Sequence, residues 1–394
     1  MSAPTGGAEP EGMAERLKLF ILAGEPSGDR IAADLVARLK QRVPLAFIGV
    51  GGHELEAQGL RSIFPMHDLA VMGISDVLMR LPLLLWRIEQ TARVIRKANP
   101  DIVVLVDAQD FSKLLAKRLK QLGFRGRTIL YVAPSVWARA PQRAAKLKPL
   151  FDEVLAVLPF EPAVMQRLGG PPTSYVGHPA LGERLTRNAV ERGPLILLPG
   201  SRDGELRRHL PLFRQIAEGL VDHPSVDGIV IPTLPALAER LTREVSSWRV
   251  PVRVVSDRAA RAELYQQSVL ALAVSGTVTL ELALAQVPMV VSYVLDSHQS
   301  RAYAKLGSPA VSLPNIILDR AAIPELVQSS PDAAALGAAV IALLDNKKAR
   351  QDQIGAFGEL SELMQNGEVD FPRQDPADRV LAHWARDQRL LSGS

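Results

Sequence analysis

Two aspartates that follow the apolar run Ile102–Val106 are the first residues placed to do chemistry. In open parallel sheets, ligands bind beyond the carboxyl ends of the strands. Asp107 stands at this strand end, where its carboxylate would project toward a ligand and could act as a general base. Asp110 has the position of a helix cap. Helix capping without catalysis is the alternative for this segment.

A second set of candidates lies in the segment Leu198–Arg202, which reads LPGSR. A strand ends here, and a turn formed by Gly200 and Ser201 exposes backbone amides. Arg202 follows at once, and its guanidinium can form a bidentate contact with a phosphate. This pattern fits a pyrophosphate better than a metal ion.

The segment Ser275–Glu281, which reads SGTVTLE, repeats this arrangement. Ser275, Gly276 and Thr277 present amides and hydroxyls at the start of a helix. Glu281 follows about one turn later, where its carboxylate could accept hydrogen bonds from both hydroxyls of a ribose. Alternatively, Thr277 or Ser275 caps the helix and no ligand binds.

The first strand ends in the small-residue turn Gly24–Asp29, GEPSGD, which opens a helix expected near Arg30. Amides freed by this turn could face an anion or a substrate hydroxyl. The turn lacks both the GxGxxG and the GK[ST] spacings, so the sequence has neither a dinucleotide fingerprint nor a P-loop here. Ser27 or Asp29 acting as an ordinary helix cap would explain the same residues.

Metal chemistry finds no support in the sequence, and no cofactor is expected. The chain has no cysteine, and none of its 7 histidines forms an i, i+4 pair or an HExxH pattern. His178 lies near the expected seam between domains, where a substrate could reach it. A loop histidine bonded to the backbone is the alternative.

Short apolar runs, each followed by a longer stretch with helical periodicity, place these turns at the ends of strands. Near-continuous apolar runs of this length are typical of parallel strands covered on both faces. The sequence therefore predicts two α/β domains, whose expected strands form two series: Leu19–Ala23, Phe47–Val50, Ile102–Val106, Ile129–Val132 and Val154–Leu158, then Leu195–Leu198, Ile229–Ile231, Val252–Val255, Leu270–Val274 and Met289–Val294.

The polar, charged stretch Gly182–Gly193 separates the two series and sets the expected domain boundary. We expect a disordered tail at residues 1–15, a first domain at 16–186 and a second at 187–366. Residues 367–394 form a turn-rich link and an amphipathic helix that returns to the first domain or to a partner chain.

The overall composition is that of an ordinary globular protein, with 47% hydrophobic and 22% charged residues in a chain of 394. The net charge of +4 is too small to indicate nucleic acid binding. The absence of cysteine excludes a disulfide scaffold. Because residues 1–15 lack the basic start and apolar stretch of a secretory signal, we expect a cytoplasmic protein.

The stretch at residues 69–88 is unusually apolar, but its uninterrupted apolar runs are far shorter than the roughly 18 residues that a membrane span needs. Pro82 is expected to kink or split it. With Arg80, Arg87 and Trp86 at its edges, the stretch could lie in a membrane interface. A buried core helix is the alternative.

These segments together resemble the lipid-A-disaccharide synthase family of bacterial glycosyltransferases. The motifs occur in that family's order between about residues 18 and 320, and they read GEPSGD, LAVMGISDVLMRLPLLL, DAQDF, YVAPSVWA, LPFE, YVGHP, LLPGSR, SGTVTLE, PMVVSY and SLPN. The resemblance implies a GT-B fold, in which two Rossmann-like domains face each other across a cleft. It also implies that the first domain handles the acceptor and the second handles the nucleotide.

The resemblance implies the reaction as well. UDP-2,3-diacylglucosamine would transfer its sugar to the 6-hydroxyl of 2,3-diacylglucosamine 1-phosphate, with inversion and without a metal. The products would be a β-linked lipid A disaccharide phosphate and UDP. The substrates' acyl chains favour the cytoplasmic face of the inner membrane as the place of action, and the family's tendency to pair through its C-terminal segment suggests a homodimer.

Residue roles are carried over position by position from the family's motifs. Asp107 matches the catalytic base, Arg202 would neutralise the leaving UDP, and Glu281 would hold the ribose. The donor set expected from the resemblance is Gly200, Ser201, Arg202, Ser275, Gly276, Thr277, Glu281 and Asn315, and the acceptor set is Glu25, Ser27, Gly28 and His178. The membrane or acyl-chain set is Ile74, Val77, Leu78, Leu81, Leu84, Leu85 and Trp86.

The chain departs from the family's pattern at four positions. Gln109 and Ser112 replace a proline and an asparagine, which would loosen the loop beside Asp107, and Ala133 and Arg139 also differ. These changes could alter acyl-chain or acceptor preference. The rival readings are a UDP-sugar transferase that uses another lipid acceptor, and an inactive protein that binds nucleotide sugars or lipids.

Overall fold

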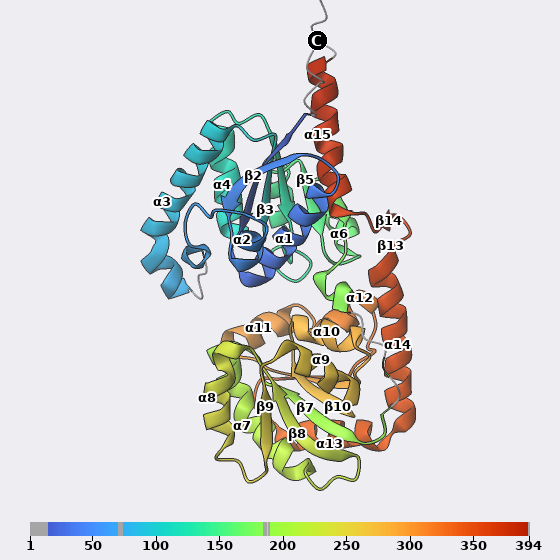
Figure 1. The fold of residues 1–394 in the computed structure, drawn as a ribbon. Helices are drawn as coiled ribbons and strands as arrows, with labels where there is room; N and C mark the ends of the chain where they lie inside the picture. Colours follow the sequence, from blue (N-terminus) through green and yellow to red (C-terminus); the bar gives the residue numbers. More distant parts are fainter. Residues whose placement is uncertain (1–14, 70–73, 184–186, 188–189, 393–394) are drawn as a thin grey trace, which may run out of the picture. The chain divides into compact units, whose positions relative to one another are not determined.

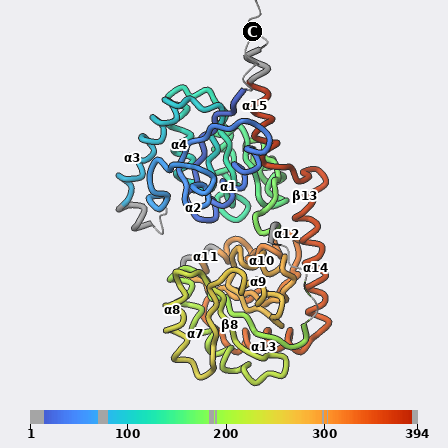
Figure 2. The backbone as a smooth tube through the Cα atoms, viewed as in Figure 1, coloured from blue at the N-terminus to red at the C-terminus, as the bar shows by residue number. Residues whose placement is uncertain are grey.

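The computed structural model describes residues 15–69, 74–183, 187 and 190–392. The chain divides into two compact units: Met1–Gly177 together with Gly367–Ser394, and His178–Asn366. Figure 2 traces the backbone out of the first unit and back into it. Apart from Glu15, the expected disordered tail lies outside the described residues.

The boundary between the units follows Gly177, before the expected position near residue 187. The reason is local packing. The short helix η2 (Pro179–Glu183) packs against α10 (Thr277–Leu284), and Arg187 donates a hydrogen bond to the carbonyl oxygen of Gln286. Both contacts lie within the second unit, so the polar stretch after Gly177 is part of that unit.

The first unit contains a parallel sheet in the order β2-β1-β3-β4-β5-β6 across the described residues. Its inner strands are apolar at almost every position, because helices cover both faces. The strands are β1 (Leu17–Ala23), β2 (Leu45–Val50), β3 (Ile102–Val106), β4 (Arg127–Tyr131), β5 (Glu153–Ala156) and β6 (Thr173–Tyr175). The helices are α1 (Pro26–Lys40), α2 (His53–Ala57), η1 (Met66–Asp68), α3 (Ile74–Ala98), α4 (Gln109–Gln121), α5 (Arg143–Leu147), α6 (Glu161–Arg167) and α15 (Pro376–Ser392).

The second unit repeats this plan, with a parallel sheet in the order β12-β11-β10-β7-β8-β9 over the described chain. Its strands are β7 (Gly193–Leu198), β8 (Val226–Pro232), β9 (Val252–Val255), β10 (Leu270–Val274), β11 (Met289–Val294) and β12 (Glu325–Gln328). Besides η2 and α10, the helices are α7 (Asp203–Leu220), α8 (Pro235–Val245), α9 (Arg258–Gln267), α11 (Ser297–Lys305), α12 (Leu313–Leu318), α13 (Ala333–Asp345) and α14 (Lys347–Asn366). Figure 1 labels the strands β7 to β10 and the helices α7 to α14 of this unit.

The C-terminal segment belongs to the first unit. A short hairpin of β13 (Gly367–Glu368) and β14 (Phe371–Pro372) leads into α15, which packs against α1 and β3. Figure 1 shows α15, in red, beside the sheet of that unit. Of the two destinations expected for this helix, the chain's own first unit is the one observed.

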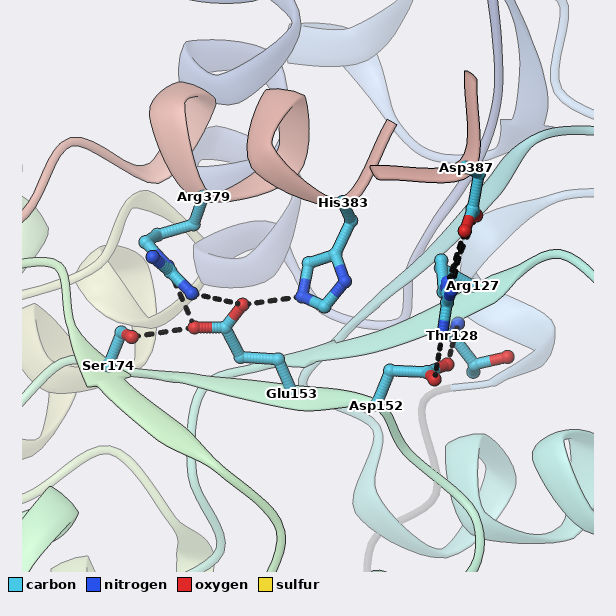
Figure 3. A network of polar contacts seen from close by, with 8 residues as sticks. All are labelled: Arg127, Thr128, Asp152, Glu153, Ser174, Arg379, His383 and Asp387. Atoms are coloured by element: carbon cyan, nitrogen blue, oxygen red, sulfur yellow. Dashed lines mark hydrogen bonds and ion pairs between the residues drawn. The ribbon is translucent and has the colours of Figure 1, made fainter. Parts of the chain in front are cut away.

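Charged side chains fix α15 to the edge of the sheet (Figure 3). Glu153 on β5 is 1% exposed and accepts hydrogen bonds from Arg379 (2.9 Å) and Ser174 (2.6 Å), while the His383 ring nitrogen lies 2.7 Å from its carboxylate. Nearby, Asp387 accepts a hydrogen bond from Arg127 at 2.9 Å. Burial alone would raise the pKa of Glu153, but these partners outweigh burial and lower it.

The apolar stretch near residue 74 forms a single helix, α3, which continues through Pro82 instead of splitting there. Along its described part, Ile88, Ala92 and Ile95 are buried, whereas Leu81, Leu85 and Trp86 are 40%, 52% and 55% exposed. No helix of the described chain is both long and apolar enough to span a bilayer.

Candidate functional site

Asp107 occupies an unusual backbone position at the carboxyl end of β3. Both Asp107 (φ 54°) and Ala108 (φ 45°) adopt the left-handed conformation, which costs about 1–3 kcal/mol for residues other than glycine. The Asp107 amide donates to the Tyr131 carbonyl at 2.9 Å, and the Ser112 hydroxyl donates to the Asp107 carbonyl at 2.8 Å. Hydrogen bonds from two elements therefore hold a strained turn in place.

The GEPSGD turn lies directly beside this carboxylate, because β1 pairs with β3 in parallel and Ala23 is aligned with Val106. A Cβ built on Gly28 would lie 3.7 Å from the Asp107 Cβ. Burial, and to a lesser degree the charge of Glu25, raise the pKa of Asp107. The structure thus brings together Asp107, Glu25 and Gly28, with Ser27 exposed on the same turn.

The capping alternative for Ser27 or Asp29 does not apply to α1. That helix begins at Pro26 rather than near Arg30, and no side chain caps its N-terminus. Asp29 is 2% exposed and accepts hydrogen bonds from the amides of Gly52 (2.8 Å) and Glu54 (2.9 Å) at the start of α2. Asp29 therefore links the GEPSGD turn to the turn that precedes α2.

Asp110 does not cap α4, because the N-terminal cap position is Ala108 and the Asp110 carboxylate is 85% exposed. The expected loosening of this loop relative to the family's pattern stays a prediction, and two side chains hold the loop in this structure. The Gln109 side-chain amide donates to the Val132 carbonyl at 3.0 Å, and Ser112 holds the Asp107 carbonyl. Both departures from the family's pattern therefore tie the loop to its surroundings.

A carboxylate that the sequence did not single out organises the loops after β4 and β5. Glu161 is 3% exposed and accepts hydrogen bonds from the Val157 and Leu158 amides and from the Trp137 indole, at 3.2, 3.0 and 3.3 Å. Burial raises the pKa of Glu161 to about 7. The Trp137 ring packs edge-on against Phe160, with ring centroids 5.4 Å apart.

In the second unit, the LPGSR and SGT turns follow neighbouring strands, because β7 pairs with β10 and Leu198 is aligned with Ala273. The LPGSR turn leads into α7 with Arg202 as its N-terminal cap residue. The Ser201 and Arg202 amides, expected to be open to an anion, instead donate to the Glu205 carboxylate at 3.1 and 3.2 Å. Arg202 itself is 76% exposed.

The SGT turn leads into α10, with Gly276 as the cap residue and no side chain capping the helix. The capping alternative for Ser275 and Thr277 therefore does not apply. Ser275 instead donates its hydroxyl to the Val311 carbonyl at 2.6 Å, while Gly276 and Thr277 remain exposed.

Asn315, expected in the donor set, lines a hollow of the second unit together with Arg320 and Glu325, and its contact with a ligand stays a prediction. Its side chain is 4% exposed, donates to Glu325 at 2.8 Å and accepts hydrogen bonds from the amides of Ala322 and Ile323. Glu325 in turn accepts hydrogen bonds from the Val311 and Ser312 amides at 2.9 Å each. In this structure Asn315 shapes the loop that holds Ser275.

Glu281 lines a hollow of about 550 Å³ within the second unit, a size typical of small-molecule sites. Tyr265, Asp257 and Arg258 line the same hollow. His178 lies at the start of this unit, and its Nδ1 accepts a hydrogen bond from the Ala180 amide at 3.1 Å. Burial lowers the pKa of His178 to about 4, so the ring is neutral near pH 7.

Of the α3 residues expected at a membrane, Leu81, Leu85 and Trp86 form an exposed apolar face, and Leu84 is half-buried. The side chains of Ile74, Val77 and Leu78 lie outside the described residues. Arg87 contacts other residues of the protein: it donates to Asp68 at 2.9 Å and stacks on two aromatic rings.

In the described part of the chain, no group of three or more acidic or histidine side chains is arranged to hold a metal ion.

Comparisons with known proteins decide the family. The lipid-A-disaccharide synthetase family model matches residues 19–372. The chain belongs to this family. A lipid-A-disaccharide synthase of Rhodospirillum centenum is 41% identical over 381 residues, covering 93% of this chain and 94% of that protein. One from Nitrobacter winogradskyi is 38% identical, covering 92% and 95%.

Solved structures agree on the fold. MurG from Acinetobacter baumannii shares 15% identity with a TM-score of 0.51, and covers 89% of this chain and 99% of its own. MnaA from Staphylococcus aureus, solved with UDP, shares 14% identity with a TM-score of 0.58, covering 96% and 98%. The expected GT-B fold is confirmed, and this lipid-A-disaccharide synthase family member is a glycosyltransferase of lipid A synthesis.

Proposed function

We propose that this chain condenses UDP-2,3-diacylglucosamine with 2,3-diacylglucosamine 1-phosphate, releasing UDP and a β(1→6)-linked disaccharide 1-phosphate. The family assignment supports the reaction class, and the placement of Asp107 supports the chemistry. In this reaction the acceptor's 6-hydroxyl oxygen bonds to the donor's anomeric carbon. The bond from that carbon to the diphosphate breaks on the opposite side, so the α-linked donor gives a β product.

Asp107 is the proposed general base, and it takes the proton of the acceptor hydroxyl as the new bond forms. Partial burial and the nearby Glu25 make its carboxylate more basic than that of an ordinary aspartate, which suits the role. The strained backbone aims the carboxylate, and pre-set geometry of this kind is itself a source of rate.

The donor is proposed to bind the second unit. Arg202 and the exposed Gly276 and Thr277 face the solvent at neighbouring strand ends, where they would stabilise the negative charge that develops on UDP. Glu281 would accept hydrogen bonds from the ribose in the hollow that it lines. With charge supplied in this way, the proposed mechanism needs no metal ion.

The test is mass spectrometry of the product formed by the purified chain from the two acylated substrates. We expect a β(1→6) disaccharide 1-phosphate and stoichiometric UDP. Asp107→Ala should lower kcat about 10²–10⁴-fold, whereas Asp110→Ala, at an exposed neighbouring carboxylate, should retain activity. Turnover only with a different lipid acceptor would identify another transferase, and binding without turnover would identify a non-catalytic protein.

We further propose that the exposed face of α3 docks on the membrane surface that holds the acylated substrates. Leu81, Leu85 and Trp86 supply the apolar contact. The triple change of these residues to serine should abolish cosedimentation with vesicles of phosphatidylethanolamine and phosphatidylglycerol. Leu306→Ser, at a 60% exposed leucine of the second unit, is the control. Equal binding by both variants would contradict this assignment.

A further inference from the structure

Glu205 is a carboxylate of the second unit to which the proposed reaction assigns no role. It lies in the first turn of α7 and is 9% exposed. One oxygen, Oε2, accepts hydrogen bonds from the Ser201 and Arg202 amides, and the other, Oε1, accepts one from Nη1 of Arg202 at 2.9 Å. The carboxylate therefore binds both the backbone and the side chain of the LPGSR turn.

The sequence around Glu205 is built to admit this carboxylate. Gly200 has φ +98°, and a Cβ there would lie 2.6 Å from Oε2 of Glu205. Any other residue at position 200 would both strain the backbone and displace the carboxylate. The turn is therefore organised around Glu205 and not around an anion from outside.

This arrangement leaves the Arg202 side chain as the part of the turn that can meet a phosphate. Within the described residues, Glu205 is the hydrogen-bond partner of its guanidinium, and it uses only Nη1. Nε and Nη2 lie on a side chain that is 76% exposed. An arginine held at one edge keeps the donors of its other edge for a diphosphate.

We propose that Glu205 is a positioning residue, which orients Arg202 toward the diphosphate of the bound nucleotide. This inference rests on the proposed function. As the third residue of α7, Glu205 completes a capping box with the backbone of Arg202, and this stabilising role accounts for its contacts to the turn amides. Capping does not require the separate contact of Oε1 with Nη1 of Arg202. Ordering the long Arg202 side chain before the ligand arrives lowers the entropy that binding would otherwise lose.

Calorimetric titration of the full chain with UDP and with uridine tests the proposal. Glu205→Ala should weaken UDP binding about tenfold, as for the loss of one charge-assisted contact, and leave uridine binding unchanged. In an Arg202→Ala background, Glu205→Ala should have no further effect on UDP binding. Glu218 forms a comparable ion pair with Arg214, at 2.8 Å, farther along the same helix. Glu218→Ala removes this ion pair and should leave UDP binding unchanged.

Glu205→Gln guards against a folding defect, because it keeps an oxygen for the turn amides and loses the charge beside Arg202. We expect a wild-type melting temperature with weakened UDP binding. If Glu205→Ala weakened UDP binding equally in the wild-type and Arg202→Ala backgrounds, Glu205 would not act through Arg202. If it weakened uridine and UDP binding equally, its effect would not involve the diphosphate. Either result would show a role in the turn alone and overturn the inference. Unchanged UDP binding in Glu205→Ala would also overturn it. If the unmodified chain bound no UDP, the proposed function itself would fail.

Discussion

Asp107 shows how a side chain's chemistry depends on residues far away in the sequence. The β3 strand end could be predicted from the apolar run before it, whereas the choice of Asp107 over Asp110 as the base stays a prediction. The left-handed turn, the hydrogen bond from Ser112 and the proximity of Glu25 could not be predicted. The proximity of Glu25 depends on the pairing of β1 with β3, which brings the turn after β1 beside Asp107.

A pH profile of kcat/KM tests this environment. A base with a raised pKa is protonated, and therefore inactive, at a higher pH than an ordinary aspartate, so activity should fall on the acid side above the usual range near 3.9. Glu25→Gln removes one cause of the raised pKa, and the acid limb should move to lower pH. An acid limb that stays in place would show that Glu25 does not act on the base.

Two glycines of the GEPSGD turn should respond differently to alanine. A Cβ on Gly24 would lie 2.6 Å from the Ala108 Cβ, whereas one on Gly28 has contacts no closer than 3.6 Å. Gly24→Ala should therefore cost about 1–3 kcal/mol through overpacking and displace the turn that carries Asp107. Gly28→Ala, the matched control, should keep the wild-type melting temperature. Similar losses of stability in both variants would contradict this account.

The role of several carboxylates in holding turns was not predictable from the sequence. Asp29, Glu161 and Glu205 are buried and accept hydrogen bonds from backbone amides of turns at strand ends, whereas Glu325 is half-buried and accepts them at the start of α12. Asp29 was considered only as a helix cap and Glu161 stands in the LPFE motif, while Glu205 and Glu325 lie outside the motifs. A carboxylate in a sequence is equally compatible with catalysis, ligand binding or a solvent-exposed face, and only its contacts in the fold show that it holds a turn in place.

At the scale of elements, α15 and β5 depend on each other through Glu153. A carboxylate that is 1% exposed has an acceptable energy only while Arg379 and His383 face it. This dependence explains why α15 packs in a unit whose sheet strands all precede residue 178.

Glu153→Gln should destabilise the first unit by about 3–5 kcal/mol, as expected for breaking a buried pair, and should make α15 sensitive to protease. Because the native pKa of Glu153 is lowered, its stabilising contribution is present at neutral pH and lost as pH falls through that pKa. Acid unfolding of the variant should therefore depend less on pH. Glu239→Gln, in an exposed pair with Arg243, should change neither property.

The strands themselves were largely predictable. All ten expected strands are present, and those at residues 102–106, 252–255, 270–274 and 289–294 have the expected bounds. The edge strands β6 and β12 were missed, because each is only three or four residues long and their segments, TSY and ELVQ, carry no apolar run.

At the scale of the whole molecule, the two units differ in continuity. His178–Asn366 is one uninterrupted segment with its own hydrophobic core, whereas the first unit needs two segments that are separated in sequence by the entire second unit.

The fragment His178–Asn366 should therefore fold alone and bind UDP, while Met1–Gly177 alone should not fold cooperatively. Met1–Gly177 alone leaves Glu153 without Arg379 and His383 and uncovers the surface that α15 covers. Amide NMR spectra and denaturant titrations of both fragments provide the measurement. Adding a peptide of residues 367–394 should restore cooperative unfolding to Met1–Gly177. A well-dispersed spectrum of Met1–Gly177 without the peptide would contradict this prediction.

The return of α15 to the first unit also sets an order of assembly during translation. Glu153 is synthesised more than two hundred residues before its partners on α15, as the numbering of Arg379 and His383 shows. The second unit can then be complete while the first unit still waits for α15. A nascent chain that stalls before α15 is made would thus carry a finished second unit and an unfinished first unit.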